Sequence, residues 1–372
     1  MPKPYGNILV NQILYNLKQC EFVTKKLYID LTTSEFFNLI NISLGFYSPL
    51  NRFCNFEDYQ NIINHNRINK KIKWTVPILL SKKNNKKKLK QHKFYQLRYK
   101  KKIVGLINAE TFFKIDKKEH NLKVFKTNSK YHPGVREIHK LNNNFIGGKA
   151  YLLNSYIPND KYFVEPYKAR KYRYFLDGTV FSTRNICHLG HEHIHRRVIQ
   201  NKNKLVVCII SSDKNKYEIK HIENTYNILK SKKIYKKLKL IKIFMPSLYA
   251  GPNEAFLQAI LFQNLGLRKF IIGRDHAGVR NFYKKYEAQK IFAKSKFLKI
   301  KILKTKEPIR CSYCNLIGFE NEKFCKRDKK KCKFVTIDGR FVRRQIDLGN
   351  FDQLKNYVSS NIANYIKKNM KV

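Results

Sequence analysis

The chain has no long apolar run. Its 372 residues include no stretch that approaches the roughly twenty apolar residues of a membrane span. One of the longest runs, residues 205–210, is only as long as a strand, and residues 1–6 carry no apolar signal core. The eight cysteines are scattered except for a C-terminal group, which argues against a secreted disulfide scaffold. We therefore expect no membrane association and a cytoplasmic location.

Acidic residues are also scarce. The chain has 26 Asp and Glu against 77 Lys and Arg, a net charge of +51. Such a charge fits a nucleic-acid or acidic-surface partner. However, the excess is mainly lysine, it accompanies many Asn, Ile, Tyr and Phe residues with A/T-rich codons, and it is spread along the whole chain. We therefore favour mutational drift in an AT-rich, reduced genome over nucleic-acid binding, because a binding footprint gathers on one face.

The pattern of strands and helices changes along the chain. Short β-type runs dominate the first part, at residues 74–80, 94–99 and 103–106, with helices expected near 34–39 and 56–63. From about residue 165, strands at 180–182, 205–210 and 269–272 alternate with helices, one of them from Pro252 to Gly266. We predict a β-rich domain over residues 1–163, an α/β domain over 164–303 and a small C-terminal region over 304–372.

Residues 182–191 read Ser-Thr-Arg-Asn-Ile-Cys-His-Leu-Gly-His, a pattern suited to phosphate. His188 and His191 fall on one face of a helical turn, and Gly190 lets a ligand approach the backbone. A helix that begins here directs N–H groups and its positive dipole end at an anion. His193 and His195 follow, and we interpret them as surface histidines rather than a metal pair.

A second segment, residues 273–278, reads Gly-Arg-Asp-His-Ala-Gly and follows a predicted buried strand. In open parallel sheets ligands bind beyond the carboxyl ends of strands, so we expect this segment to lie near the first motif. Arg274 and His276 are candidate donors to anions. The alternative is a tight strand-to-helix turn in which Arg274 pairs with Asp275.

Together the two segments resemble one family, ATP sulfurylase or sulfate adenylyltransferase. The family's first motif, Gln-Thr-Arg-Asn-Pro-x-His-x-(Gly/Ala)-His, is matched here at Thr183, Arg184, Asn185, His188, Gly190 and His191. Its Gly-Arg-Asp-His-Ala-Gly motif is matched in full, and residues 249–255 resemble its Tyr-Ala-Gly-Pro-Arg-Glu-Ala motif. Further similar segments lie at residues 1–6, 45–50, 74–78, 132–135 and 338–343, so that the resemblance covers nearly the whole chain.

The resemblance implies an α+β and α/β multidomain fold. Its parts are a β-rich, PUA-like N-terminal domain, a Rossmann-like nucleotidyltransferase domain and a small C-terminal segment. The implied reaction converts ATP and sulfate to adenylyl sulfate (APS) and pyrophosphate, or the reverse during sulfur oxidation. The implied substrate carries Mg²⁺ on its phosphates, and the implied assembly is a homo-oligomer.

The resemblance also implies roles for individual residues. Catalysis is expected from positioning and charge stabilisation, and no carboxylate pair or Ser-His-Asp arrangement stands out. The expected catalytic residues are Thr183, Arg184, Asn185, His188 and His191. The expected ATP-binding residues are Arg184, Asn185, His188, His191, Gly273, Arg274, Asp275 and His276, and the expected sulfate-binding residues are Ser182, Arg184 and Ala277.

The chain departs from the family's pattern at several positions. Ser182 stands in place of a glutamine that contacts sulfate, and Ile186 in place of a proline, which is expected to loosen the turn before His188. Leu248 and Asn253 each replace an arginine, and Arg52 replaces a glycine. Losing one transition-state donor costs on the order of a hundredfold in rate. The alternative function is therefore a decayed or re-purposed nucleotidyltransferase of the same fold.

The C-terminal cysteines resemble a metal site only in part. Some bacterial family members carry a structural zinc on three cysteines and one histidine, but Ile317 stands where the second cysteine is expected. Cys311 and Cys314 form a Cys-x-x-Cys pair, which Cys325 and Cys332 complete to a tetrahedral Cys₄ set for Zn²⁺. The alternative is a group of free thiols or a decayed site.

Overall fold

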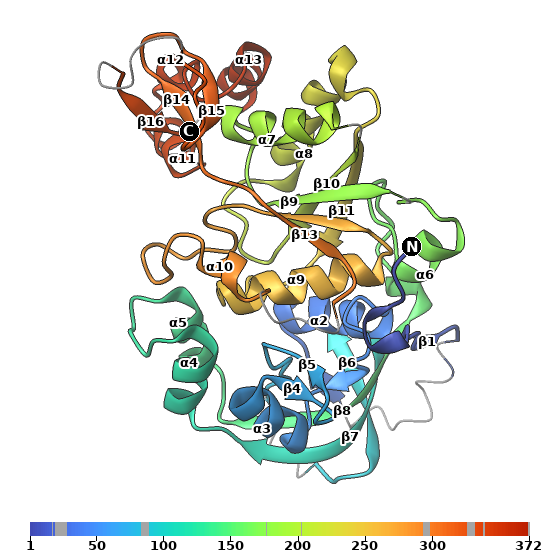
Figure 1. Ribbon diagram of the computed structural model, residues 1–372. Helices are drawn as coiled ribbons and strands as arrows, with labels where there is room; N and C mark the ends of the chain where they lie inside the picture. Colours follow the sequence, from blue (N-terminus) through green and yellow to red (C-terminus); the bar gives the residue numbers. More distant parts are fainter. Residues whose placement is uncertain are drawn as a thin grey trace.

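The computed structural model describes residues 1–16, 18, 28–82, 89–175, 177–201, 203–292, 298–325, 332–337 and 339–370. In Figure 1 the N-terminal elements lie at the bottom, a parallel sheet lies in the middle and the C-terminal elements lie at the top. Three short 3-10 helices, η1 (Tyr5–Asn7), η2 (Asn154–Tyr156) and η3 (Lys233–Tyr235), connect larger elements.

A six-stranded, mostly antiparallel sheet forms the N-terminal region. Its order is β1-β8-β7-β6-β2, with β3 also paired to β8. The bounds are β1 (Ile13–Leu14), β2 (Tyr28–Asp30), β3 (Arg52–Phe53), β6 (Lys93–Tyr99), β7 (Lys102–Lys114) and β8 (Asn144–Leu153). The other elements are α2 (Thr33–Ser43), α3 (Phe56–His65), the hairpin of β4 (Arg67–Ile68) and β5 (Ile72–Lys73), α4 (Lys117–Phe125) and α5 (Pro133–Lys140). A capping box between Thr32 and Glu35 begins α2.

The prediction of a strand at residues 74–80 is wrong. Strand β5 ends at Lys73, just before this segment. The backbone of residues 74–80 then bonds to separate partners instead of joining a ladder. Cys54 N donates to Ile78 O, and Ile146 N donates to Leu80 O. The segment is apolar because it crosses the core, where Trp74 is fully buried, and a buried crossing has the same apolar pattern as a buried strand.

The α/β region is built on a five-stranded parallel sheet. Its strands are β9 (Gly178–Thr183), β10 (Lys204–Ser211), β11 (Lys239–Phe244), β12 (Lys269–Ile272) and β13 (Lys301–Lys304), in the spatial order β11-β10-β9-β12-β13. All neighbouring strands are parallel. The order runs outward in both directions from the β9–β12 pair, which makes that pair the topological switch point of a Rossmann-like sheet. The predicted Rossmann-like fold is confirmed.

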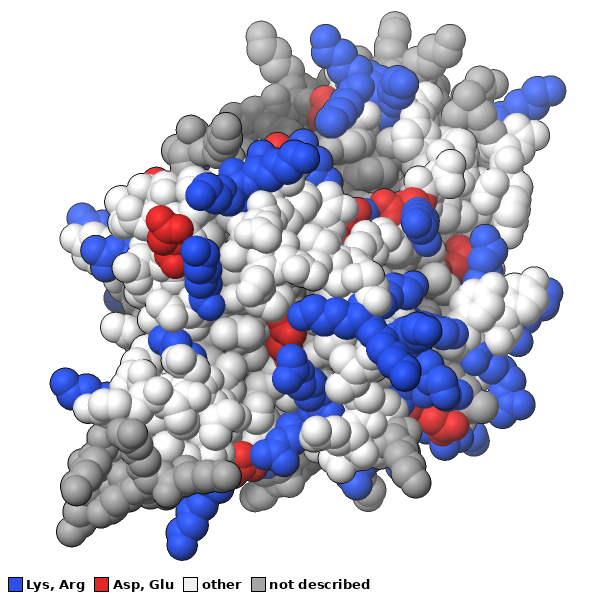
Figure 2. Space-filling view, turned by 90° about the horizontal axis from the view of Figure 1, so that it is seen from above, with Lys and Arg blue, Asp and Glu red and all other residues white. Residues whose placement is uncertain are grey.

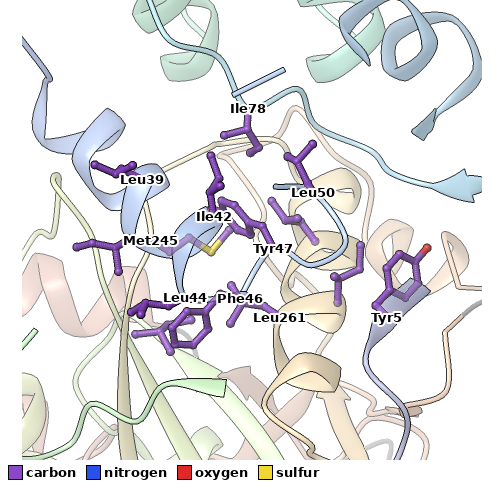
Figure 3. Close-up of a cluster of buried hydrophobic side chains, with 14 of the residues drawn as sticks. Tyr5, Leu39, Ile42, Leu44, Phe46, Tyr47, Leu50, Ile78, Met245 and Leu261 are labelled. Carbon is purple, nitrogen blue, oxygen red and sulfur yellow. The ribbon is translucent and has the colours of Figure 1, made fainter. Parts of the chain in front are cut away.

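Helix α9 (Pro252–Asn264) joins this sheet to the N-terminal region. The other helices here are α6 (Pro166–Lys171), α7 (Leu189–Gln200), α8 (Ile219–Lys230) and α10 (Glu287–Lys290). Every residue of α9 from Glu254 onward is buried. Figure 3 shows Leu261 of α9, Leu39 and Ile42 of α2, and Met245 among the side chains of one hydrophobic cluster. The N-terminal region and the sheet therefore share a continuous core.

The C-terminal elements pack against α7 and α8, which lie on one side of the parallel sheet. They comprise the antiparallel strands β14 (Pro308–Cys311), β15 (Ile317–Phe319) and β16 (Phe334–Thr336), and the helices α11 (Gly339–Asp347), α12 (Phe351–Leu354) and α13 (Ser360–Asn369). Val342 and Ile362 share a second hydrophobic cluster with Phe181 of β9 and Tyr226 of α8. The domain limits at residues 163 and 303 stay predictions.

Basic side chains occur over the whole of the one face that Figure 2 draws. Figure 2 shows Lys and Arg side chains scattered across one whole face, with Asp and Glu side chains between them. Within the part of the chain that the structure describes, no helix combines the length and the apolar character that crossing a membrane requires.

Candidate active site

A cleft of about 520 Å³ lies at the carboxyl ends of β9 and β12, at the switch point of the sheet. This volume is within the usual range for small-molecule sites. The cleft brings together the predicted catalytic, ATP-binding and sulfate-binding residues. They are Ser182, Thr183, Arg184, Asn185, His188, His191, Gly273, Arg274, Asp275, His276 and Ala277.

One group of residues, which we call the histidine end, consists of His188 and His191 in the cleft lining and Tyr226 behind them. His188 caps α7, with its Nδ1 accepting from the His191 backbone N–H at 3.4 Å. The two imidazole rings stack with centroids 3.7 Å apart, and the Tyr226 hydroxyl lies 3.1 Å from His191 Nδ1. Burial, with smaller contributions from His188 and His195, holds the pKa of His191 well below its usual range. At neutral pH His191 is therefore a hydrogen-bonding group and not a cation.

His195 is not the surface residue that the sequence predicts. It is fully buried against Phe181 and Tyr226, and neither ring nitrogen has a hydrogen-bond partner among the described residues. Burial lowers the pKa of His195 to about 3, so the ring is neutral. The helical repeat explains the error, because His195 lies one turn beyond His191 on the face that packs against the sheet.

The turn before α7 is held in place despite its missing proline. Ile186 is buried in the second hydrophobic cluster. The next residue, Cys187, donates its backbone N–H to the Thr225 hydroxyl at 3.2 Å. Packing and this hydrogen bond restrain the turn that Ile186 is expected to loosen.

A second group of residues, which we call the arginine end, consists of Ser182, Arg184, Glu254, Gln258 and His276. One terminal nitrogen of Arg184 donates to the buried Glu254 carboxylate at 2.6 Å. Arg184 Nε is buried and has no hydrogen-bond partner among the described residues. A buried guanidinium N–H needs an acceptor, which indicates a site for an anionic ligand.

Gln258 connects the other members of the arginine end. Its Oε1 lies 3.1 Å from Ser182 Oγ and 2.9 Å from His276 Nε2, and its Nε2 donates to Glu254 at 3.3 Å. Burial, together with the charge of Arg184, lowers the pKa of His276 to about 4. The imidazole of His276 is therefore neutral at pH 7.

The segment 273–278 forms a tight turn whose backbone faces the cleft. A Cβ at Gly273 would point into open space, so this backbone is accessible to a ligand. A Cβ at Gly278 would collide with the Asp275 carboxylate, and Ala277 has a φ of 53°. Arg274 pairs with Glu307 at 3.0 Å and lies 4.0 Å from Asp275, so its guanidinium is anchored by carboxylates.

The motifs in the sequence do not predict several of the residues that line the cleft. Arg343 of α11 donates to Asn185 Oδ1 at 2.6 Å and so connects the C-terminal region to the first motif. Among the described residues that line the cleft, the cations outnumber the two carboxylates, Glu254 and Asp275; the cations are Arg184, Lys214, Lys216, Arg274, Arg280, Arg340 and Arg343. The resemblances at residues 249–255 and 338–343 are signals for Glu254 and Arg343. Nothing in the local sequence distinguishes Lys214 and Lys216 from the other lysines.

Three of the family departures lie outside the cleft lining. Leu248 packs in the hydrophobic cluster around Val76 and Phe125. Asn253 donates its side-chain amide to Val124 O at 2.9 Å, which attaches α9 to α4. Arg52 pairs with Glu110 in the N-terminal sheet. These side chains support the packing of the N-terminal region.

The C-terminal cysteines converge at the hairpin of β14 and β15. Cys325 Sγ lies 3.7 Å from that of Cys311, 3.5 Å from that of Cys314 and 3.4 Å from that of Cys332. The first three form a group whose sulfurs all lie within 4.8 Å of one another, and Cys332 is outside it. Four sulfurs about 2.3 Å from a tetrahedral zinc stand about 3.8 Å apart, so the spacing of Cys311, Cys314 and Cys325 suits the ion, with Cys332 close to Cys325. Hydrogen bonding from the Cys314 backbone lowers the pKa of Cys311 to about 6, which favours the thiolate.

The fold and the cleft define a Rossmann-like α/β protein with a cationic site at its switch point. Residues 177–353 match the family model described as ATP-sulfurylase, and residues 2–155 match that of the PUA-like domain. The sulfate adenylyltransferase of Pyrococcus abyssi is 31% identical over 360 residues, covering 93% of each chain. That of Chloroflexus aurantiacus is 28% identical over 360 residues, covering 94% of this chain and 92% of the relative. The chain belongs to the sulfate adenylyltransferase family.

A solved structure shows the same fold at greater distance. A hexameric APS kinase from Thiobacillus denitrificans superposes with a TM-score of 0.71 at 14% identity, covering 100% of this chain and 69% of that one. The family resemblance and the PUA-like N-terminal domain predicted from the sequence are thus confirmed.

Proposed function

We propose that this chain transfers the adenylyl group of MgATP to sulfate, giving adenylyl sulfate and pyrophosphate, or runs the reverse reaction. The observation that carries the proposal is the meeting of two sequence-distant motifs in one cationic cleft at the sheet's switch point. Membership of the family supports it. The cleft supplies donors for two anions, and this reaction must bring two anions together.

In the proposed reaction an oxygen of sulfate attacks the α-phosphorus, and the bond from that phosphorus to the bridging oxygen of pyrophosphate breaks. The sulfate dianion needs no base, so the protein contributes positioning and charge stabilisation. Arg184, Ser182 and the Ala277 backbone N–H hold sulfate, and Thr183 and Asn185 contact the α-phosphate. The expected partners of the departing pyrophosphate are His188 and His191.

The adenine nucleotide is proposed to lie against segment 273–276, where the open space beside the Gly273 backbone leaves room for it. Asp275 and His276 complete this side of the nucleotide site. The ion pair of Arg274 with Glu307 holds the turn in place, and the Arg274 guanidinium also adds positive charge to the cleft. Mg²⁺ arrives with ATP, bound to the phosphates.

The test is the ATP-forming direction. Purified protein is incubated with adenylyl sulfate, pyrophosphate and Mg²⁺, and ATP is detected by luciferase. We expect ATP formation that depends on both substrates. Protein that binds ATP but forms none from adenylyl sulfate contradicts the proposal and favours a re-purposed nucleotidyltransferase. RNA or DNA retention with a steep salt dependence would instead favour a nucleic-acid binder.

We also propose that Cys311, Cys314, Cys325 and Cys332 hold a structural Zn²⁺. The close sulfur positions and the lowered pKa of Cys311 support this proposal. Elemental analysis of the full chain is expected to find about one zinc per chain, as a Cys₄ site binds. Cys314→Ser should lose the metal, whereas Cys208→Ala, in the core of the sheet, should keep it. A metal-free protein that takes up no added zinc contradicts the proposal.

Two further proposals concern the oligomeric state and the cellular location of the protein. The resemblance to a hexameric structure supports a homo-oligomer, which light scattering on a sizing column tests directly. A cytoplasmic location suits the free thiols of Cys54, Cys187 and Cys208, because reducing compartments keep thiols unpaired. Secretion of the chain into an oxidising compartment would contradict that location.

A further inference from the structure

Gln258 is an unusual residue for the centre of a buried helix. It lies on α9 between apolar neighbours, is only 2% exposed, and yet lines the cleft. Each polar atom of its side chain has a partner, and the partners come from three separate elements: Ser182 on β9, Glu254 on α9 itself and His276 after β12. A buried amide so fully bonded rigidifies the groups around it.

The chemistry of these partners fixes the orientation of the amide. A carboxylate only accepts, so the nitrogen Nε2 must face Glu254. The oxygen Oε1 then faces Ser182 and His276, which must both donate to it. His276 therefore carries its proton on Nε2, and the other ring nitrogen, Nδ1, is left as an acceptor.

The same amide acts on Arg184 through Glu254. The Glu254 oxygen that receives Gln258 Nε2 is also the one that binds the Arg184 guanidinium. Because Glu254 is buried, its position decides where the guanidinium points, and Arg184 Nε is the buried donor that still needs an acceptor. Gln258 thus connects the proposed oxyanion donors without requiring contact with the substrate.

The contact with Ser182 also limits the size of the side chain at that position. Ser182 Oγ already lies 3.1 Å from Gln258 Oε1. A longer side chain at position 182 that follows the same direction would occupy the space of the amide. The short residue on β9 and the long residue on α9 are therefore matched in size.

We propose that Gln258 is a positioning residue for oxyanion recognition and that it forms a size-matched, functionally coupled pair with Ser182. The inference rests on the proposed function of the cleft. In this proposal, the amide that holds the arginine end in place comes from helix α9 and not from strand β9.

The first test removes the amide at constant volume. Gln258→Met is expected to lower kcat/KM for ATP formation by about tenfold to a hundredfold, the usual effect of losing an orienting partner behind a functional group. In the forward direction the KM for sulfate should rise more than the KM for ATP. The matched control is Gln263→Met on the same helix, equally buried but bonded to the backbone of Lys3, Lys299 and Ile300. This control should change the melting temperature and leave both KM values near wild type.

The second test exchanges the two side chains. Ser182→Gln and Gln258→Ser are each expected to lower kcat/KM, the first by crowding and the second by leaving Glu254 and His276 without their partner. The double variant should be at least about fivefold more active than the product of the single effects, because residues in contact do not act additively. Single effects that simply multiply would overturn the pairing. A Ser182→Gln variant that is faster than wild type would overturn it too.

A binding measurement separates this inference from the proposed function. Sulfate should raise the melting temperature of the wild-type chain and raise that of Gln258→Met less. Wild-type protein that forms no ATP but shows this difference contradicts the proposed reaction and supports the positioning role. Equal sulfate-induced shifts in both proteins, or no shift in either, overturn the role of Gln258 whatever the outcome of the catalytic assay.

Discussion

The two ends of the cleft are built in different ways. The two histidines of the histidine end come from one continuous segment, with His188 capping α7 and His191 stacked on it, and Tyr226 of α8 packs behind them. The arginine end is assembled from separate elements around an ion pair between the half-buried Arg184 and the buried Glu254. Local backbone geometry therefore specifies the histidine pair, whereas long-range packing specifies the arginine end. The two ends should respond differently to mutation and to pH.

The largest expected effect is at the arginine end. Arg184→Lys keeps a positive charge beside Glu254 but loses the planar guanidinium with its several N–H donors. We expect kcat/KM to fall by about a hundredfold or more, the magnitude for loss of a transition-state donor. The ATP-forming assay measures it. The control is Arg268→Lys, since Arg268 pairs with Asp177 on the surface. A loss of less than about threefold would show that the arginine end does not depend on the guanidinium.

An intermediate effect is expected at the histidine end. Tyr226→Phe removes the hydroxyl beside His191 Nδ1 and so frees the tautomer of that imidazole. We expect a fall of about tenfold in kcat, as for a lost orienting partner, with the KM for sulfate unchanged. Loss of the hydrogen bond should lower stability by about 1 kcal/mol. Tyr217→Phe is the control, because the buried Tyr217 hydroxyl has no partner among the described residues. A raised sulfate KM in Tyr226→Phe would mean that the ends are not separate.

The sequence predicts most of the fold because its elements are locally consistent. The strand at residues 269–272 and the start of α9 at Pro252 are found where periodicity and proline place them. The strand prediction for residues 74–80 fails because burial alone gives this segment its apolar pattern. No periodicity distinguishes a buried crossing from a buried strand.

The same reasoning explains which site residues are predictable. His188 and Arg184 stand in contiguous motifs, so their types and spacing are visible in the sequence. Gln258 and Tyr226 lie on helices whose apolar spacing only indicates packing, and their partners are brought to them by the sheet topology. His195 is misjudged for a related reason, since its position on the inner face of α7 depends on how that helix docks.

A smaller effect concerns acid stability. Burial lowers the pKa of His195 to about 3, against about 6.5 for an unfolded histidine. Between these values the unfolded chain binds more protons, so the stabilisation is complete above pH 6.5 and is lost as pH falls toward 3. The melting temperature should fall between pH 7 and pH 5, and less steeply in His195→Leu. Parallel pH profiles for the two proteins would contradict a buried neutral imidazole.

The smallest effect is expected outside both ends. Asn253→Ala removes the amide bond to Val124 O and should lower stability by about 1 kcal/mol. Because Asn253 does not line the cleft, kcat and both KM values should stay at wild-type levels. Chemical denaturation and steady-state kinetics check the two halves of this statement. A kinetic defect without a loss of stability would extend the site to the start of α9.

Sulfate-dependent exchange of labelled pyrophosphate into ATP is the sharpest test of adenylyl transfer to sulfate, because it requires both ends of the cleft in one reaction. We expect label to enter ATP only when MgATP, pyrophosphate and sulfate are all present, and Arg184→Lys to abolish most of the exchange. Exchange that proceeds equally well without sulfate, or its complete absence in a folded wild-type protein that binds ATP, would contradict direct adenylyl transfer to sulfate.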